Sequence, residues 1–502
     1  MKIFYLNYMR QLNFILLKRL QLILLAVMIP HLANAHDFEV DGIYYLINGN
    51  GATVTYRGDS SFQYSDEYTG AVNIPSTVTY DGTTYSVTEI GFAAFMNCTG
   101  LTSVAIPNSV TKILNEAFFQ CSGLTSVTIG NSVTKIGIDA FSHCSGLTSV
   151  TIPNSVTTIG GGAFYSCSGL TSVTIGNSVT SIGCNVFEGT AWYNNQPDGL
   201  VYAGTVAYKY KGTMPNGTSI VLMDGCTLIA DQAFFRCSGL TSVTIGNSVT
   251  KIGDDAFSQC SGLTSVTIGN SVTTIGYNAF SYCTGLTSVT IPNSVTSIGE
   301  RVFSTCIGLT SIAVEEGNPK YDSRYNCNAI IETESNTLIA GCKNTIIPNS
   351  VTTIGGGAFY SCSGLTSVAI PNSVTTIGDN AFRGCTGLTS IKSKILNPDN
   401  VLMGGRVFAE VDKSNCTLNV PQGTLEIYQA TPQWNDFVNI VEVPFIPGDV
   451  NDDGFVTSAD VTAIYDVLLG TGNQFDNTAD VNGDGVVTSA DVTAIYDILL
   501  GN

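Results

Sequence analysis

The chain has 502 residues, a net charge of −19 and only 12% charged residues. That length allows two or more domains, and frequent Gly, Thr, Ser and Asn with little charge favour β-rich repeats over helices. The sequence contains no basic patch that could neutralise phosphates, which argues against nucleic-acid binding.

Residues 1–35 are predicted to be a secretory signal peptide. Basic residues precede an apolar run from Leu22 to Ile29, and the Ala-Asn-Ala at 33–35 fits a small-x-small cleavage site. The apolar run is too short to span a bilayer. We therefore expect a secreted mature chain that begins at His36, has no transmembrane segment, and is extracellular or associated with a cell surface.

A 23-residue unit, which reads CSGLTSVTIPNSVTTIGGGAFYS at 144–166, recurs along most of the mature chain. Cys98, Cys121, Cys144 and Cys167 are each 23 residues apart, and a Phe recurs in the same register. The register is interrupted twice, which predicts divergent coils near 188–233 and 313–346. We expect the middle of the second interruption, residues 321–336, to leave the repeat array as a loop.

The spacing of Leu, Val and Ile within the unit is typical of leucine-rich repeats. In LTSVTI we expect three side chains to point inward (Leu124, Val127, Ile129) and three outward (Thr125, Ser126, Thr128). Each coil leaves its apolar face uncovered until the next one stacks on it, so identical side chains should form ladders at roughly 4.8 Å per coil. The outward Thr and Ser columns suit a solvated strand face, but a hydroxyl surface that binds glycan, protein or ice is an alternative.

These repeats resemble the BspA-like, or Treponema pallidum-type, leucine-rich repeats over about residues 38–442. The opening GIYYLI and VNIPSTVTYDGTTYSVTEIGFAAF resemble the N-terminal cap of that family, and CTLNVPQGTLEIYQATPQW with FVNIVEV resembles its C-terminal cap. The resemblance implies a mainly β solenoid of 23-residue coils at 93–390, between caps at 36–92 and 391–443. It also implies a surface protein that adheres to host molecules or to other cells.

The 15 cysteines are explained by the repeat. One inward Cys per coil is a small buried hydrophobe. Stacked neighbours would lie near disulfide range, but their Cβ vectors are parallel and slightly too far apart. We expect buried free thiols, and no zinc site, because the chain has no CxxC pair and only three His.

The sequence predicts a protein that is not an enzyme. His143 occupies a variable repeat position, and the other two His stand at 31 and 36, so no Ser-His-Asp or Cys-His arrangement is available. Paired carboxylates could support glycoside hydrolysis, but the acids of the repeats are few and scattered. The second interruption, which carries acids together with Tyr321 and Arg324, is the remaining candidate for catalysis.

Two near-identical segments follow a predicted linker at 444–447. They read DVNDDGFVTSAD at 449–460 and DVNGDGVVTSAD at 480–491, and each has the spacing of a 12-residue calcium loop. Calcium is a hard cation that takes six to eight oxygen ligands. We expect two calcium ions, held by Asp449, Asn451, Asp453, Phe455, Thr457 and Asp460 in the first loop and by Asp480, Asn482, Asp484, Val486, Thr488 and Asp491 in the second.

The segment 448–502 resembles a type I dockerin, because each loop closes with Asp instead of Glu and is followed, not preceded, by an amphipathic helix. The resemblance implies a small α-helical domain that docks onto a cohesin-like protein when calcium is bound. By resemblance the partner contacts are Ser458, Ala459, Tyr465, Asp466, Ser489, Ala490, Tyr496 and Asp497. Familiar type I dockerins have Ser-Thr before the closing Asp and basic residues on the helix, whereas this chain has Ser-Ala and Tyr-Asp.

The sequence as a whole predicts a secreted, non-catalytic adhesion or recognition protein. Its solenoid would bind a host or cell-surface protein or a glycan, and its dockerin-like tail would attach it to a cohesin-like partner. The alternative is an accessory glycan-binding component of an extracellular polysaccharide-degrading complex.

Overall fold

The computed structural model describes residues 36–58, 60, 67–444, 446, 448–450, 455–469, 479, 481–482 and 487–500. The predicted signal peptide, residues 1–35, lies outside the described residues. The chain divides into two compact units, Met1–Ser178 with Asn185–Asn195 and Val179–Cys184 with Gln196–Asn502.

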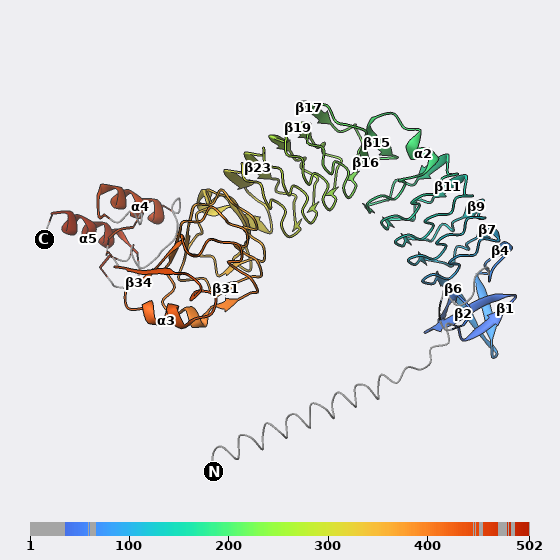
Figure 1. Cartoon of the computed structure of the whole chain (residues 1–502), viewed down its shortest axis with the longest axis horizontal. Coiled ribbons are helices and arrows are strands. Elements are labelled where there is room, and N and C mark those ends of the chain that lie inside the picture. Colours follow the sequence, from blue (N-terminus) through green and yellow to red (C-terminus); the bar gives the residue numbers. More distant parts are fainter. Residues whose placement is uncertain are drawn as a thin grey trace, which may run out of the picture. The chain divides into compact units, whose positions relative to one another are not determined.

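The first unit is a stack of coils in which every coil carries two short strands (Figure 1). One column of strands follows the LTSVTI segments and contains β4 (Gly70–Asn73), β7 (Leu101–Ala105), β9 (Ser126–Thr128), β11 (Ser149–Ile152) and β13 (Ser172–Ile175). The other follows the segments that end in Ile-Gly and contains β6 (Thr83–Ile90), β8 (Lys112–Ile113), β10 (Lys135–Ile136) and β12 (Thr158–Ile159). Neighbouring strands of a column pair in parallel with a 23-residue register, as Ile136 does with Ile113 and Ile159.

The interior of the stack is made of ladders of identical side chains, as predicted. Of the three side chains predicted to point inward, Leu124 is fully buried, Ile129 nearly so and Val127 only partly, while Thr125, Ser126 and Thr128 are exposed. Phe95, Phe118, Phe141, Phe164 and Phe187 stack ring on ring with centroids 4.8–5.7 Å apart. This apolar ladder is continuous, so each coil is stable only when its neighbours cover it.

The polar residues of the repeat also act between coils. The Thr125 hydroxyl donates to the Thr102 carbonyl, 23 residues earlier, and the Asn131 N–H donates to the Asn108 side chain. Most of the ladder thiols do the same: Cys144 Sγ, for example, lies 3.1 Å from the Phe118 carbonyl oxygen. All 15 cysteines are free and all but Cys184 are buried, which agrees with the predicted thiol ladder.

The N-terminal end of this unit is an antiparallel hairpin that joins the parallel column. Its strands are β1 (Phe38–Val40), β2 (Ile43–Asn48) and β3 (Gly51–Thr55), with β5 (Thr77–Tyr80) pairing β6. Strand β3 lies parallel to β6, and Tyr68 packs on the first ladder ring, Phe95, with centroids 4.4 Å apart. The unit also holds the short helix α2 (Ala191–Asn194), which the Thr190 side chain caps.

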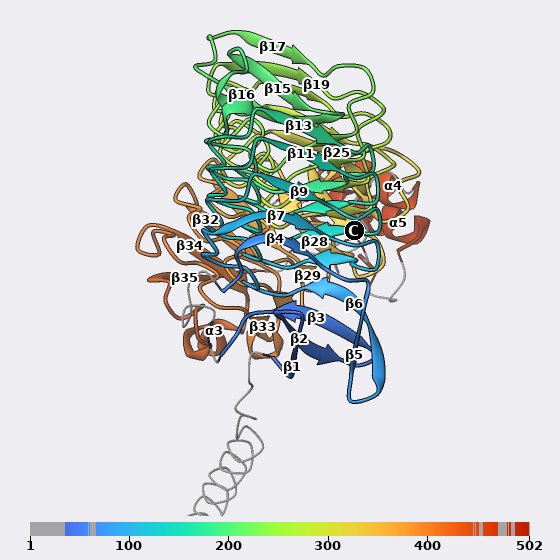
Figure 2. The same cartoon turned by 90° about the vertical axis from the view of Figure 1, so that its right-hand side faces the viewer.

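The second unit repeats the same coil. Its LTSVTI column contains β17 (Thr218–Val221), β19 (Leu240–Thr244), β21 (Ser265–Thr267), β23 (Ser288–Ile291), β25 (Ser311–Val314), β30 (Ser367–Ile370), β32 (Ser390–Ser393), β34 (Thr417–Pro421) and β35 (Asn439–Val443). Its other column contains β18 (Leu228–Ile229), β20 (Lys251–Ile252), β22 (Thr274–Ile275), β24 (Ser297–Ile298), β29 (Thr353–Ile354), β31 (Thr376–Ile377) and β33 (Leu402–Met403). Strand β14 (Ser181–Ile182) also falls in the second unit. Seen from the end, the strands of each unit lie one above another as successive rungs (Figure 2).

Both interruptions of the repeat are β-hairpins. The first is formed by β15 (Gly199–Ala203) and β16 (Val206–Lys211). Strand β16 also pairs in parallel with β18, which begins the next coil. The second contains β26 (Tyr321–Asp322), the 3-10 turn η1 (Arg324–Asn326), β27 (Ala329–Glu332) and β28 (Thr337–Gly341). Strand β28 pairs in parallel with β29 of the following coil.

The prediction that residues 321–336 leave the solenoid as a loop is therefore wrong. Ile330, Ile331 and Leu338 of the hairpin are fully buried, and the hairpin edge is hydrogen-bonded to the following coil. An antiparallel hairpin has no 23-residue period, so the register of the repeat could not reveal it.

The last coil is covered by an aromatic cap. Helix α3 (Leu425–Ala430) follows β34, and the short turn η2 (Pro398–Asn400) precedes β33. Trp434 and Phe437 are buried against Phe408, with ring centroids 5.2 and 5.3 Å away. These rings supply the apolar surface that a further coil would otherwise provide.

The C-terminal region is small and helical, with α4 (Ser458–Leu468) and α5 (Ser489–Leu500). Ile464 and Ile495 are fully buried between the helices, together with Val461, Ala479, Val487 and Val492. The observed fold is therefore the predicted one: a mainly β solenoid of 23-residue coils with a small helical C-terminal region.

Candidate calcium-binding and recognition sites

The closing carboxylate of the first predicted calcium loop lies in the first turn of α4. Asp460 is fully buried, and its Oδ1 accepts the Val450 N–H at 2.7 Å. Its Oδ2 accepts the Thr457 N–H at 2.7 Å, while the Thr457 hydroxyl accepts the Ala459 N–H. The carboxylate thus joins the start of the loop to its end.

The second loop is closed in a similar way, although the Oδ1 of its closing Asp accepts from the third loop residue instead of the second. Asp491 is fully buried in the first turn of α5 and accepts the Asn482 N–H at 3.1 Å and the Thr488 N–H at 2.8 Å. The Thr488 hydroxyl accepts the Ala490 N–H at 3.1 Å, as Thr457 does in the first loop. The two segments are therefore alike in structure as well as in sequence.

The buried carboxylates suit a cation. Asp449, Asp460 and Asp491 are all buried, and residues 448–502 contain no Lys, Arg or His that could neutralise them. Burying several carboxylate charges together costs several kcal/mol unless cations compensate them, and hard carboxylate oxygens are the ligands that calcium prefers. The residues present therefore fit calcium.

Seven of the twelve predicted ligands lie among the described residues. These are Asp449, Phe455, Thr457, Asp460, Asn482, Thr488 and Asp491. The other five lie outside the described residues: Asn451, Asp453, Asp480, Asp484 and Val486. Among the described residues alone, no group of three or more His, Cys, Asp or Glu side chains is close enough to hold a metal ion. The ligand set remains a prediction.

All eight predicted partner contacts lie on the outer surface of the two helices. Ser458, Ala459, Ser489 and Ala490 are exposed in the first turns, and Asp466 and Asp497 are exposed further along. Tyr465 and Tyr496 are each 47% exposed, so neither ring is buried between α4 and α5. Their role as partner contacts remains a prediction.

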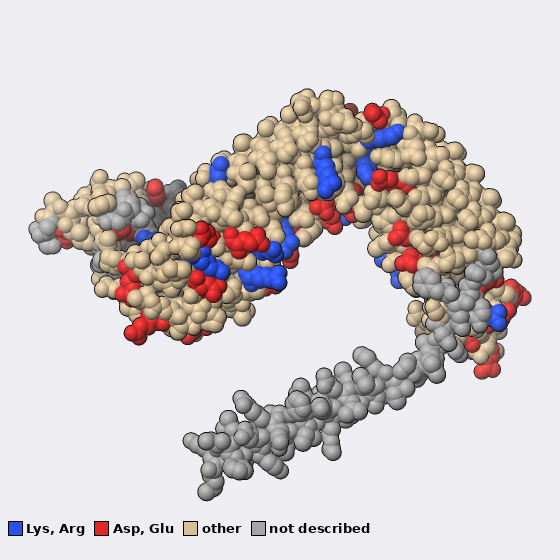
Figure 3. Space-filling view, in the orientation of Figure 1, with Lys and Arg blue, Asp and Glu red and all other residues tan. Residues whose placement is uncertain are grey.

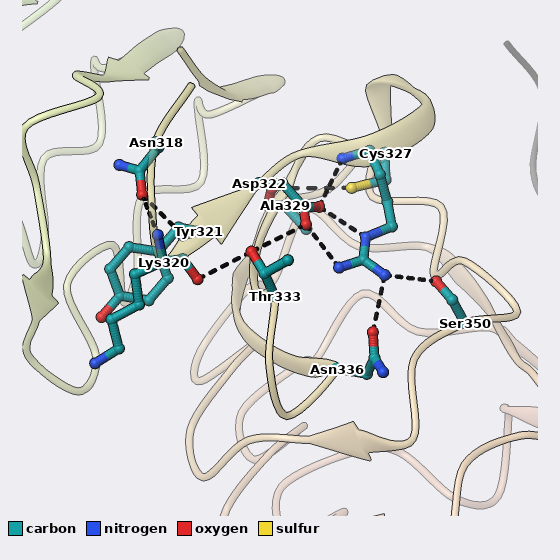
Figure 4. Close-up of polar contacts among 10 residues, drawn as sticks. Asn318, Lys320, Tyr321, Asp322, Cys327, Ala329, Thr333, Asn336 and Ser350 are labelled. Carbon is teal, nitrogen blue, oxygen red and sulfur yellow. Dashed lines mark hydrogen bonds and ion pairs between the residues drawn. The ribbon is translucent and has the colours of Figure 1, made fainter. Parts of the chain in front are cut away.

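The second hairpin, the remaining candidate for catalysis, is held together by its own polar groups (Figure 4). Arg324 donates to both carboxylate oxygens of Asp322, at 2.8 and 2.6 Å, and to the side chains of Asn336 and Ser350. The hydrogen bond from Ser335 lowers the pKa of Glu332, whereas a general acid requires a raised pKa. These contacts connect the hairpin to the following coil and serve the fold.

Asp231 has the only carboxyl pKa in the described coils that is raised to about 6, through burial. Its Oδ1 accepts the Asp254 N–H at 2.9 Å, and Asp254 Oδ1 accepts the Tyr277 N–H at 2.8 Å. Asn115 in the first unit makes the same bond to the Ile138 N–H. The raised pKa is therefore the result of burying a carboxylate whose role is a coil-to-coil hydrogen bond.

Comparison with known protein families covers most of the chain. A family model described as "BspA type Leucine rich repeat region", with 6 copies, matches residues 58–194, 206–331 and 330–430. The chain belongs to the BspA-type leucine-rich repeat family. A second model, "Dockerin type I domain", matches residues 447–500.

Solved structures of leucine-rich repeat proteins are also similar. A leucine-rich cell surface protein from Faecalibacterium prausnitzii is 26% identical over 71% of this chain and 94% of its own, with a TM-score of 0.27. A leucine-rich repeat protein from Bacteroides ovatus is 23% identical over 81% of this chain and 100% of its own, with a TM-score of 0.29. The leucine-rich repeat protein of T. pallidum is 23% identical over 50% of this chain and 90% of its own, with a TM-score of 0.27. None of the curated proteins compared with the chain matches it.

These matches describe a leucine-rich repeat protein with a dockerin domain. Both kinds of domain are typically non-catalytic binding modules of extracellular or surface-associated proteins, and no catalytic domain is indicated. Type I dockerin domains bind calcium, and their presence implies a cohesin partner. No helix among the described residues is long and apolar enough to cross a membrane.

Proposed function

We propose that this chain is an exported, non-catalytic recognition protein. Its solenoid binds a ligand, and its C-terminal domain attaches it to a cohesin-like partner while two calcium ions are bound. In this reading residues 1–35 direct export, and adhesion to a host or cell-surface protein or glycan is the task of the coils.

The observation that carries the proposal is the likeness of the two calcium segments. Each presents a buried closing Asp with the same backbone bonds and an exposed Tyr-Asp pair on the following helix. Tyr buries a rigid ring while keeping a polar tip, which suits an interface. Two equivalent faces would let the domain dock in either of two orientations.

The docking half is tested by calcium-dependent capture of a cohesin-domain protein. The mature chain, residues 36–502, is immobilised and exposed to an envelope extract of the producing organism with calcium or with EDTA. We expect a cohesin-domain protein to be retained in calcium alone, and to be lost when Asp460→Asn and Asp491→Asn are combined. Retention that is equal in EDTA would overturn the proposal.

Ligand binding by the solenoid is tested separately for glycans and for proteins. Binding of the mature chain to a glycan array is compared with its binding to purified matrix proteins. Selective binding to plant polysaccharides, without binding to matrix proteins, would favour the accessory role in a polysaccharide-degrading complex over adhesion.

A further inference from the structure

Five side chains of the second unit form a continuous column, which we name the Tyr–Arg column: Tyr277, Arg301, Tyr360, Arg383 and Glu410. Arg301 donates to the Tyr277 hydroxyl at 3.2 Å, and its guanidinium lies 4.6 Å from the centroid of the Tyr360 ring. Arg383 lies 5.7 Å from the same ring and is paired with Glu410 at 2.7 Å. Each member therefore touches the next.

The column runs along five successive turns of the stack. Each turn contains the Ala-Phe or Val-Phe pair of one coil, and the second hairpin contributes no such turn. The Thr305 N–H consequently donates to the Tyr360 carbonyl, although the two residues are 55 positions apart in the sequence. With about 5 Å between coils, the column is about 20 Å long, which matches an extended segment of about six residues.

The coil fold does not require these side chains. Position 301 lies two residues before the ladder Phe, where other coils carry Gly357, Asn278 or Asn380, all with positive φ. Arg301 adopts the same backbone with φ 57°, a conformation that costs about 1 kcal/mol for most residues. Position 360 is occupied by Ser in the two preceding turns, at Ser281 and Ser304. The repeated positions, by contrast, are buried or hydrogen-bonded between coils.

Arginine is concentrated in the turns around the ladder Phe residues of the second unit, inside and outside the column. Six arginines follow residue 35, and four of them stand within two residues of a ladder Phe in the second unit: Arg236, Arg301, Arg383 and Arg406. Most of the surface seen in Figure 3 carries no charge. Charged and aromatic side chains on an otherwise neutral repeat are the residues that dominate binding energy at protein interfaces.

The column is also ordered before any ligand arrives. Stacking and hydrogen bonding hold both guanidinium groups, so less side-chain entropy is lost on binding. Arg383 is neutralised by Glu410, whereas Arg301 makes no ion pair with a carboxylate anywhere in the described part of the chain. Arg301 is thus an uncompensated cation between two tyrosine rings.

We propose that the Tyr–Arg column is the ligand-binding surface of the second unit and takes an extended polypeptide segment with an Asp or Glu carboxylate at its centre. The carboxylate pairs with Arg301, and side chains on either side pack on Tyr277 and Tyr360. A polyanionic glycan would need several uncompensated cations, and the column offers one. This assignment rests on the proposed recognition function and names the surface and ligand class for it.

The test uses substitutions that other coils already contain, so the coil should fold. Arg301→Asn is combined with Tyr360→Ser in the mature chain. The matched control combines Phe235→Ser with Arg236→Asn, which removes a cation stacked 5.0 Å from a ring in a turn outside the column. Melting curves of the three proteins in calcium should agree to within a few degrees.

A random dodecapeptide library is selected on the unsubstituted chain, and the enriched peptides are then measured on all three proteins. We expect enriched peptides to share an acidic residue, and synthetic copies to bind the column variant at least tenfold more weakly than the control variant. Heparin and xylohexaose are measured against the same three proteins.

Three results would overturn the assignment. Peptides that bind all three proteins alike would place polypeptide recognition elsewhere and leave the proposed function standing. Heparin or xylohexaose binding that is lost only in the column variant, without peptide enrichment, would make the column a glycan site. No enrichment and no glycan binding would contradict both the assignment and the recognition half of the proposed function.

Discussion

Replacing Asp231 with Asn should stabilise the protein at neutral pH. Burial raises the pKa of Asp231 to about 6, while its Oδ1 accepts the Asp254 N–H at 2.9 Å. An amide oxygen can accept the same bond, as Asn115 does from Ile138 at 3.0 Å in the first unit. Asp231→Asn therefore keeps the coil-to-coil bond and removes a buried charge.

The size of the effect follows from the pKa. A shift from the ordinary 3.8 to about 6, at about 1.4 kcal/mol per pKa unit, corresponds to at most about 3 kcal/mol. Because the folded state binds the proton more tightly, the stabilising contribution of Asp231 is complete below about pH 4 and is lost as the pH rises through about 6. The variant should gain most at pH 7.5 and little at pH 4.

The assay is urea unfolding of the mature chain at pH 4, 5.5 and 7.5 with calcium present. The control is Asn115→Asp, which places a carboxylate in the same hydrogen bond at an exposed position, and its effect should depend little on pH. A stability difference for Asp231→Asn that is the same at all three pH values, or a loss of stability at pH 7.5, would refute the role of burial.

Four further outcomes are expected. EDTA should raise hydrogen exchange in α4 and α5 but not in the coils, since calcium binding energy is largely folding energy for so small a domain; equal protection with and without EDTA would contradict this. A thiol reagent should label at most one Cys in the native chain and all 15 after denaturation, whereas disulfides between consecutive coils in mass spectra would count against the ladder. Replacing Tyr465 and Asp466 with Ala should leave cohesin affinity nearly intact, and replacing Tyr496 and Asp497 as well should abolish it; a large loss from the first pair alone would mean that the faces are not equivalent. The isolated chain should hydrolyse neither glycans nor peptides, and turnover that survives stringent purification would disprove this.

The repeat was predictable because its physical requirements recur at a fixed interval. A Phe, a Cys and three aliphatic residues must be inward in every coil, so periodicity alone identified the solenoid and its ladders. The thiol ladder followed in the same way, since one Cys per coil at identical depth leaves parallel Cβ vectors. The structure adds a reason for Cys at this position, which is the bond from most of these thiols to the Phe carbonyl of the preceding coil.

The hairpins were not predictable from periodicity. Residues 329–331 are all buried, and residues 337–340 alternate partly buried and buried positions as a strand does. Both segments interrupt the 23-residue register, and periodicity therefore predicts a loop over 321–336 instead of a hairpin. The positive φ values two residues before and after each ladder Phe were equally hidden, because Arg, Tyr and Glu do not indicate left-handed backbone. The Tyr–Arg column depends on both features and is invisible in the sequence.

The solenoid and the C-terminal segment satisfy their buried polar groups in different ways. Each coil satisfies its polar groups through the preceding coil, as the Thr125 hydroxyl does with the Thr102 carbonyl, so the solenoid needs no cation. Where the structure describes it, the C-terminal segment consists of two short helices and buries carboxylates, and the segment contains no basic residue. Its stability should therefore depend on calcium while that of the coils does not. Attachment could then be released by calcium withdrawal without unfolding the surface that binds the ligand.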